Sequence, residues 1–195
     1  DRLDVAFDAA LDARTPSALA RLLQFAPKVT DERRERLLST LAEVVPERRK
    51  MALREVASLR IRLERWGAAV ESLAQLAQLE EDPKARAALH VERGETLLHR
   101  LKDPAGARVA FERALVDDGT QLVAVRELVE LARGDAERFV PMVERLIVLA
   151  GEEAAAPFRE ELAAGYEQVG RLKEASRVLA QLDEGDELAS TATRQ

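Results

Sequence analysis

The stretch Val5–Leu11, which reads VAFDAAL, returns as VAFERAL at Val109–Leu115. In both copies apolar and small residues recur three and four positions apart, which is the spacing of one face of an α-helix. An amphipathic phrase that returns far along a chain indicates an internal repeat. The fold is therefore expected to be built from copies of one small helical unit.

Composition also favours a helical fold. The chain has 195 residues, of which 47% are hydrophobic, 34% charged and only 4% aromatic. Alanine, leucine, arginine and glutamate dominate, and these residues form helices more readily than strands. Turn signals such as "EDPK" at Glu81–Lys84 and "KDPAG" at Lys102–Gly106 separate the amphipathic stretches, so the sequence predicts eleven short helices and almost no strand.

A common register relates these helices. A small or apolar residue is followed by a large apolar residue four positions later and by another apolar residue three positions after that. The middle residues of six such triplets lie about 34 positions apart on average, and they are Phe7, Leu41, Leu73, Phe111, Val143 and Leu179. We expect them to fill the space between packed helices, while the small residues Ala57, Gly94 and Ala163 allow close approach.

With this period and two helices per unit, the sequence resembles the tetratricopeptide repeat (TPR) family. The copy that matches best runs from Leu162 to Leu182, with alanine in place of one family glycine, and the next best runs from Gly94 to Ala114. A further copy keeps Trp66, and its aromatic ring is expected to pack in the core. The resemblance implies an all-α fold, a right-handed α-solenoid of antiparallel helix pairs (a TPR-like superhelix).

The resemblance also implies a single solenoid over residues 1–183, with about five and a half repeats. It would begin with a half repeat at 1–13 and continue in five repeats at about 14–45, 46–83, 84–118, 119–150 and 151–183, before a tail or linker at 184–195. The first helix has the pattern of a second helix and no partner before it. We therefore expect the sequence to be a fragment of a larger protein.

Charge is segregated along the chain. The net charge is -6, yet residues 33–65 contain ten Lys and Arg against five Asp and Glu. On the helix predicted to begin near Pro46, one face is apolar and the other carries Arg54, Ser58, Arg62 and Arg65. Neither Arg54 nor Arg62 has an acidic residue three or four positions away. Solvated arginines, or arginines paired to a neighbouring repeat, are the plainer interpretation of this stripe.

In the TPR family the first helix of each repeat lines a concave groove that receives a peptide or helix of another protein. The resemblance therefore implies a protein-interaction scaffold or adaptor that binds an acidic or mixed-charge segment of a partner. The groove would be basic toward one end and acidic toward the other, and its expected residues are Arg54, Ser58, Arg62, Arg65, Glu95, His99, Glu160 and Glu167. The family's carboxylate clamp requires asparagine, which this chain lacks, so that clamp is not carried over.

The alternative interpretation is a nucleic-acid-binding or regulatory sensor module that uses the basic segment 33–65, although the negative net charge argues against nucleic acid. No catalytic, cofactor or metal site is predicted, because the chain has no cysteine and His90 and His99 point to opposite sides of one helix. No stretch is apolar enough for a membrane span. We expect a bacterial, cytoplasmic protein that is not an enzyme.

Overall fold

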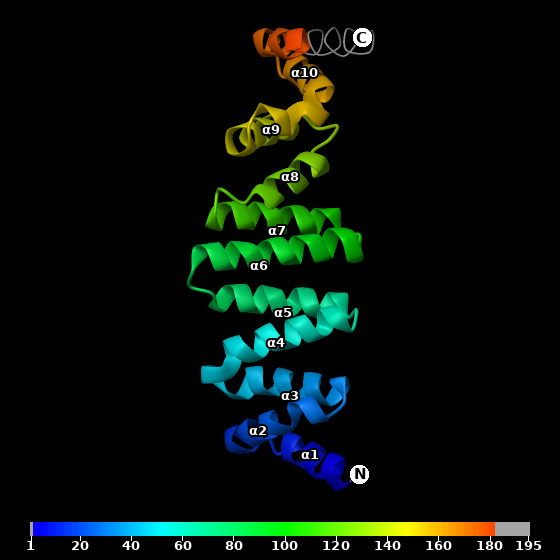
Figure 1. Cartoon of the computed structure of the whole chain (residues 1–195), viewed down its shortest axis with the longest axis vertical. Coiled ribbons are helices and arrows are strands. Elements are labelled where there is room, and N and C mark those ends of the chain that lie inside the picture. Colours follow the sequence, from blue (N-terminus) through cyan, green and yellow to red (C-terminus); the bar gives the residue numbers. More distant parts are fainter. Residues whose placement is uncertain (1, 182–195) are drawn as a thin grey trace, which may run out of the picture. The chain divides into compact units, whose positions relative to one another are not determined.

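The computed structural model describes residues 2–181, and within that range every regular element is a helix (Figure 1). Ten α-helices, α1 to α10, are followed by an eleventh over residues 172–181, which is the number that the sequence predicts. The predicted all-α class is therefore confirmed. The predicted tail at 184–195 lies outside the described residues.

The chain forms two compact units, Asp1–Ala110 (unit 1) and Phe111–Gln195 (unit 2). The helices of unit 1 are α1 (Arg2–Asp12), α2 (Pro16–Leu22), α3 (Asp31–Val44), α4 (Arg49–Arg62), α5 (Trp66–Leu79) and α6 (Pro83–Glu95). Unit 2 contains α8 (Leu122–Leu131), α9 (Ala136–Ala150), α10 (Arg159–Gln168) and the helix at 172–181. Helix α7 (Pro104–Asp117) contains the boundary between the units.

Four short segments of 3₁₀ or π helix adjoin these α-helices. They are the 3₁₀ segments η1 (Leu23–Lys28), η2 (Pro46–Arg48) and η4 (Glu152–Phe158), and the π segment η3 (Thr96–Arg100). Each belongs to the first helix of a predicted repeat. Every predicted repeat range contains two of the α-helices, although α6 begins one residue before its range, and the division into repeats stays a prediction.

Local chemistry explains where the helices begin and turn. The Thr15 hydroxyl accepts a hydrogen bond from the backbone of the first turn of α2, and Thr30 and Asp135 cap α3 and α9 in the same way. The turns that follow α4 and α10 each contain one residue in the left-handed region, with φ of 56° at Glu64 and 78° at Gly170. Both turns thus reverse the chain with the same backbone conformation.

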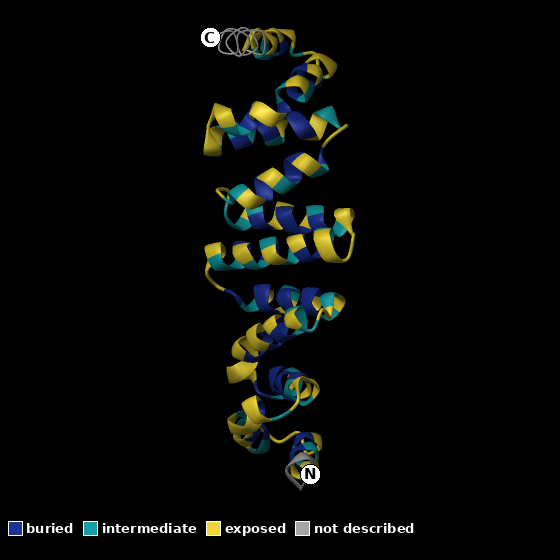
Figure 2. Ribbon diagram, turned by 45° about the vertical axis from the view of Figure 1, so that its right-hand side comes forward, coloured by how far each residue is buried: buried dark blue, intermediate teal, exposed yellow. Residues whose placement is uncertain are grey.

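Within each unit, neighbouring helices pack side by side. Helix α4 packs against α3 and α5 in unit 1, and α9 packs against α8 and α10 in unit 2. The buried faces of these helices turn toward one another, while their other faces are exposed (Figure 2). Five of the six middle residues of the sequence triplets are buried as predicted: Phe7, Leu41, Leu73, Phe111 and Val143.

The prediction is wrong for the sixth residue, Leu179, which is 42% exposed. It lies on the helix at 172–181, the last one that the structure describes, and among the described residues no later helix covers this face. Ala57, Gly94 and Ala163 are buried, as their predicted packing role requires. Trp66 is only half-buried, and the guanidinium carbon of Arg100 lies 4.9 Å from its ring centroid.

Candidate interaction surfaces

Helix α4 has the two faces that its sequence predicts. Ala52, Leu53, Val56, Ala57 and Leu59 are buried. The opposite face carries Met51, Arg54, Ser58 and Arg62, which are spaced three or four residues apart and exposed. Arg65 belongs to the turn that follows the helix.

A buried carboxylate from the end of α5 receives two cations of α4. The Glu80 side chain is only 7% exposed, whereas that of Arg54 is 61% exposed. Lys50 Nζ donates to Glu80 Oε1 over 2.7 Å, and Arg54 Nη2 donates to Glu80 Oε2 over 3.3 Å. The hydrogen bond from Lys50, more than the nearby charges, lowers the pKa of Glu80. Two cations of α4 thus share one buried carboxylate.

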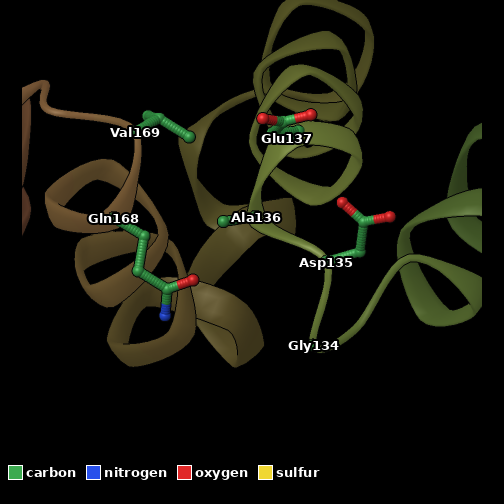
Figure 3. Close-up of a pocket in the computed structure, with 6 residues that line it drawn as sticks. All are labelled: Gly134, Asp135, Ala136, Glu137, Gln168 and Val169. Atoms are coloured by element: carbon green, nitrogen blue, oxygen red, sulfur yellow. The ribbon is translucent and has the colours of Figure 1, made fainter.

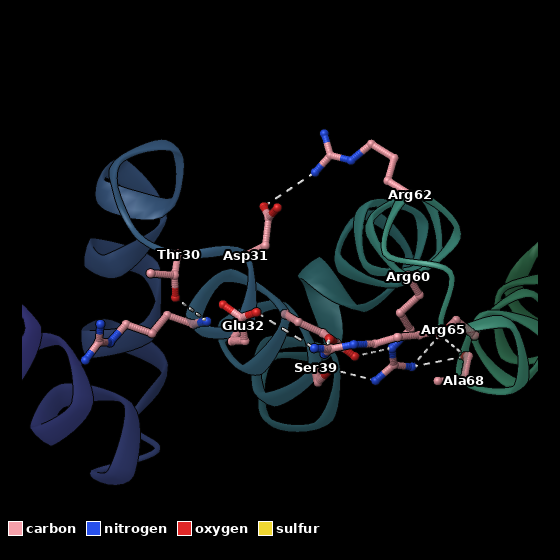
Figure 4. A network of polar contacts seen from close by, with 11 residues as sticks. Thr30, Asp31, Glu32, Ser39, Arg60, Arg62, Arg65 and Ala68 are labelled. Carbon is pink, nitrogen blue, oxygen red and sulfur yellow. Dashed lines mark hydrogen bonds and ion pairs between the residues drawn. The ribbon is translucent and has the colours of Figure 1, made fainter.

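A second buried carboxylate, Glu35 of α3, organises a polar network that joins α3, α4 and α5 (Figure 4). Arg60 Nε donates to Glu35 Oε1 over 2.7 Å, and Arg65 contacts the other oxygen of the same carboxylate. The remaining guanidinium nitrogens of Arg60 donate to Ser39 Oγ at 3.2 Å, the Ala68 carbonyl at 3.2 Å and Ser72 Oγ at 2.6 Å. The network satisfies the buried charge of Glu35 through two arginines, one on each carboxylate oxygen.

Beside this network, the end of α4 faces the first turn of α3. Arg62 Nη2 lies 3.6 Å from Asp31 Oδ1, and Arg65 Nη2 lies 4.0 Å from Glu32 Oε1 (Figure 4). We call this place the α3/α4 edge. Its ion pairs are exposed, and such pairs contribute little stability in water. The arginine stripe thus has partners on neighbouring helices, none of them in α4 itself.

The other predicted groove residues are placed as follows. Ser58 Oγ donates to the Arg54 carbonyl over 3.1 Å, so its hydroxyl hydrogen is used within the helix. Glu95 and His99 are exposed in unit 1, together with the arginines. The exposed Glu160 and Glu167 belong to α10 of unit 2. A groove that joins all eight residues stays a prediction.

Unit 2 contains a surface hollow of about 770 Å³ between the first turn of α9 and the end of α10. We call it the α9/α10 hollow, and its lining residues are Gly134, Asp135, Ala136, Glu137, Gln168 and Val169 (Figure 3). A smaller adjoining hollow shares Ala136 and is lined also by Ala164 and Gly165. Small side chains therefore leave the space open.

Acidic groups surround the α9/α10 hollow, and most of them have partners. Glu161 accepts from the backbone N–H of Gly134 over 3.3 Å and lies 3.7 Å from Arg133. Asp135 caps α9 and lies 3.4 Å from Arg138. Glu137 is exposed, and no ion pair joins it to a cation within residues 2–181.

The sequence did not indicate either buried carboxylate or the hollow. Glu35 and Glu80 look like ordinary helix-surface acids, because their partners lie 25 to 30 residues away along the chain. The turn at residues 133–135 leads into α9, but the hollow also needs the turn after α10 beside it. A signal was present in the small residues Ala164 and Gly165 at the end of a first helix.

Neither a metal-binding cluster nor a membrane-spanning helix occurs within residues 2–181. No group of three or more histidine, aspartate or glutamate side chains among those residues could hold a metal ion. None of the helices described is both long and apolar enough to cross a membrane.

The chain is similar in structure to solved helical-repeat proteins. One structure described as MamA has a TM-score of 0.51 at 16% identity, covering 86% of this chain and 95% of its own. A second MamA protein structure has a TM-score of 0.52 at 15% identity, covering 95% and 94%. A Podosopora anserina structure, titled as a putative kinesin light chain with nearly identical TPR-like repeats, has a TM-score of 0.49 at 15% identity, covering 94% of each chain.

No family model matches the sequence, and no curated protein matches it either. At about 15% identity the two MamA likenesses show the fold alone. The fold is a TPR-like helical repeat, as the sequence resemblance implies.

Proposed function

We propose that the protein is an interaction scaffold whose unit 1 binds an acidic segment of a partner protein along α4. The observation that carries the proposal is the exposed row of Met51, Arg54, Ser58 and Arg62 on one face of that helix. A helical repeat that presents an exposed charged face suits binding to another protein.

The charges around α4 support an acidic partner. Lys50 and Arg54 share the single carboxylate of Glu80, and Arg60 and Arg65 share that of Glu35. The Glu80 cluster has two cations for one carboxylate, whereas the Glu35 cluster is balanced because Arg65 also pairs with Glu32. Charge complementarity of this kind speeds encounter and selects orientation more than it adds affinity. Met51, one helical turn before Arg54, offers an apolar contact beside the charges.

The test uses a blocked peptide of alternating glutamate and leucine residues, titrated into the full chain and followed by NMR. We expect the amide signals of α4 to shift, and we expect binding to weaken about tenfold, or roughly 1.4 kcal/mol, in the double variant Arg54→Gln and Arg62→Gln. Glutamine is preferred to glutamate because a new carboxylate would repel Glu80 and Asp31. Arg113→Gln, an exposed change on α7, is the matched control.

Three outcomes would contradict the proposal. The double variant could bind as tightly as the unchanged protein, or the shifts could fall outside α4. The third is preferential binding of a single-stranded oligonucleotide, with an affinity that falls steeply as salt rises. That result would support the nucleic-acid interpretation of residues 33–65.

A further inference from the structure

The α9/α10 hollow of unit 2 occupies the same place in its helix pair as the α3/α4 edge does in unit 1. Ala136 and Asp31 are each the first residue of a second helix. Gln168 and Arg62 are each the last residue of the first helix that follows. The two places can therefore be compared residue by residue.

In unit 1 this place is occupied by arginine side chains of the chain itself. Arg62 reaches Asp31, and Arg65 reaches Glu32 in the first turn of α3. In unit 1, arginine side chains thus fit between these two turns. A guanidinium group lies against the carboxylates of a helix N-terminus, where their negative charge is itself favourable.

In unit 2 neither arginine is present at this place. Gln168 replaces the arginine at the helix end, and it has no positive charge. Arg171 precedes its helix as Arg65 does, but its guanidinium lies against Glu144 at 2.8 Å and Glu174 at 3.0 Å. Glu137, the counterpart of Glu32, remains at the hollow without a cation among the residues described.

We propose that the α9/α10 hollow binds an arginine side chain of a partner protein. The hollow has a volume of about 770 Å³ and is open to solvent, so a long side chain can reach it from outside. Glu137 supplies a carboxylate to the lining and Gln168 supplies an amide, while the Asp135 carboxylate caps α9 and pairs with Arg138 (Figure 3). A planar guanidinium with several donors suits this set better than the compact ammonium of lysine.

The floor of the hollow is suited to the stem of such a side chain. Ala136 presents only a methyl group to the hollow, and Gly134 presents no side chain. The apolar part of an arginine can lie on these groups while its charged end stays near the carboxylates. The site belongs to unit 2, so it is independent of the acidic-partner proposal for α4.

The experiment titrates the full chain with the blocked peptide Ala-Ala-Arg-Ala-Ala and records backbone amide signals by NMR. We expect saturable shifts at Gly134, Glu137 and Val169. The same peptide with citrulline, which keeps the shape of arginine without its charge, is expected to bind at least about tenfold more weakly. Shifts spread evenly over acidic surfaces, or equal binding of the citrulline peptide, would overturn the proposal.

Two variants test the place itself. Gln168→Arg places an arginine where unit 1 has Arg62. The new side chain should occupy the hollow, so the peptide should no longer shift the amide signals around it. Glu137→Gln should weaken binding about tenfold, because it removes the carboxylate that has no cation. The control is Gln24→Arg, which adds the same charge at an exposed site in unit 1. Arginine-peptide binding that survives Gln168→Arg, or is lost equally in Gln24→Arg, would refute the site.

Discussion

The α3–α5 region of unit 1 and the α9–α10 region of unit 2 have corresponding helices. The side chains at corresponding positions between these helices are charged in unit 1 and belong to an apolar core in unit 2. Glu35 and Val140 are each the fifth residue of a second helix. Arg60 and Tyr166 each lie two residues before the end of the following first helix. Unit 1 joins the helices at these positions with a buried ion pair, whereas unit 2 uses an apolar core to which Val140 and Tyr166 belong.

The difference shows that a helical repeat constrains the arrangement of its helices more tightly than the type of side chain that packs between them. An ion pair in a protein interior must recover the cost of removing both charges from water, so it is not inherently more stable than apolar packing. In unit 1 the pair is held by five hydrogen bonds from Arg60 and Arg65 to four residues. In unit 2 the apolar core packs tightly, because a Cβ atom added at Gly165 would lie 2.9 Å from Cγ2 of Val140.

The largest expected effect concerns the buried carboxylate of unit 1. Glu35→Ala leaves Arg60 buried without its counterion, and we expect the free energy of unfolding to fall by about 3 to 5 kcal/mol. Urea denaturation measures the loss. Glu43→Ala is the control, because Glu43 pairs with Arg14 on the surface and should contribute less than about 1 kcal/mol. Equal losses in the two variants would mean that the network does not hold the helices together.

The next prediction tests close packing in unit 2. A Cβ atom added at Gly165 would lie 2.9 Å from Cγ2 of Val140, so Gly165→Ala should cost about 1 to 3 kcal/mol of stability despite the better helix propensity of alanine. Adding Val140→Ala should recover part of the loss. The control is Gly67→Ala on α5, where no atom lies within 4 Å of the new Cβ. That variant should be neutral or stabilising by up to about 1 kcal/mol.

A third prediction uses the pH dependence of the unit 2 core. Burial, followed by the hydrogen bond to Glu144 over 3.0 Å, raises the pKa of Tyr166 to about 12. The folded state keeps this proton more tightly than the unfolded state, whose tyrosine pKa is about 10. The stabilisation from this proton is therefore complete below pH 10 and is lost as pH rises from 10 to 12. The free energy of unfolding lost by pH 11 is about 1.4 kcal/mol.

Tyr166→Phe should remove this part of the alkaline loss. The measurement compares the free energies of unfolding of the variant and the unchanged protein at pH 9 and 11. A difference between them that does not change with pH would contradict the raised pKa of Tyr166.

The smallest expected effect comes from transplanting the edge of unit 1 into unit 2. Ala136→Asp with Gln168→Arg recreates the pair that Asp31 and Arg62 make, and it should add about 0.2 to 1 kcal/mol of stability. Raising the salt concentration should remove the gain, because the pair is exposed. A double-mutant cycle in low and high salt measures it, and a coupling energy of zero in low salt would show that the two places are not equivalent.

The repeat itself could be predicted from the sequence. Phe7 and Phe111 stand in nearly identical heptapeptides, and both are buried. Helix amphipathicity depends on residues three and four positions apart, so periodicity alone reveals helices and their inner faces. The same argument failed at Leu179, because burial requires a covering helix as well as an apolar residue.

The candidate sites could be predicted only in part. The exposed face of α4 with Arg54 and Arg62 follows from helical spacing, and the structure confirms that both residues are exposed. Their partners, Glu80 and Asp31, come from other helices, and spacing within one helix says nothing about them. The α9/α10 hollow was missed for the same reason, since it lies between two turns that are far apart in the sequence.

By itself, the sequence determined the helices, their number and the faces they bury, because these depend on local propensity and short-range periodicity. Only the tertiary structure decided how the charges are used. Glu35 and Glu137 are both acids near the start of second helices, yet one is buried against Arg60 and the other lines an open hollow. The electrostatic role of a side chain depends on which neighbour reaches it, and that is settled only when distant helices pack together.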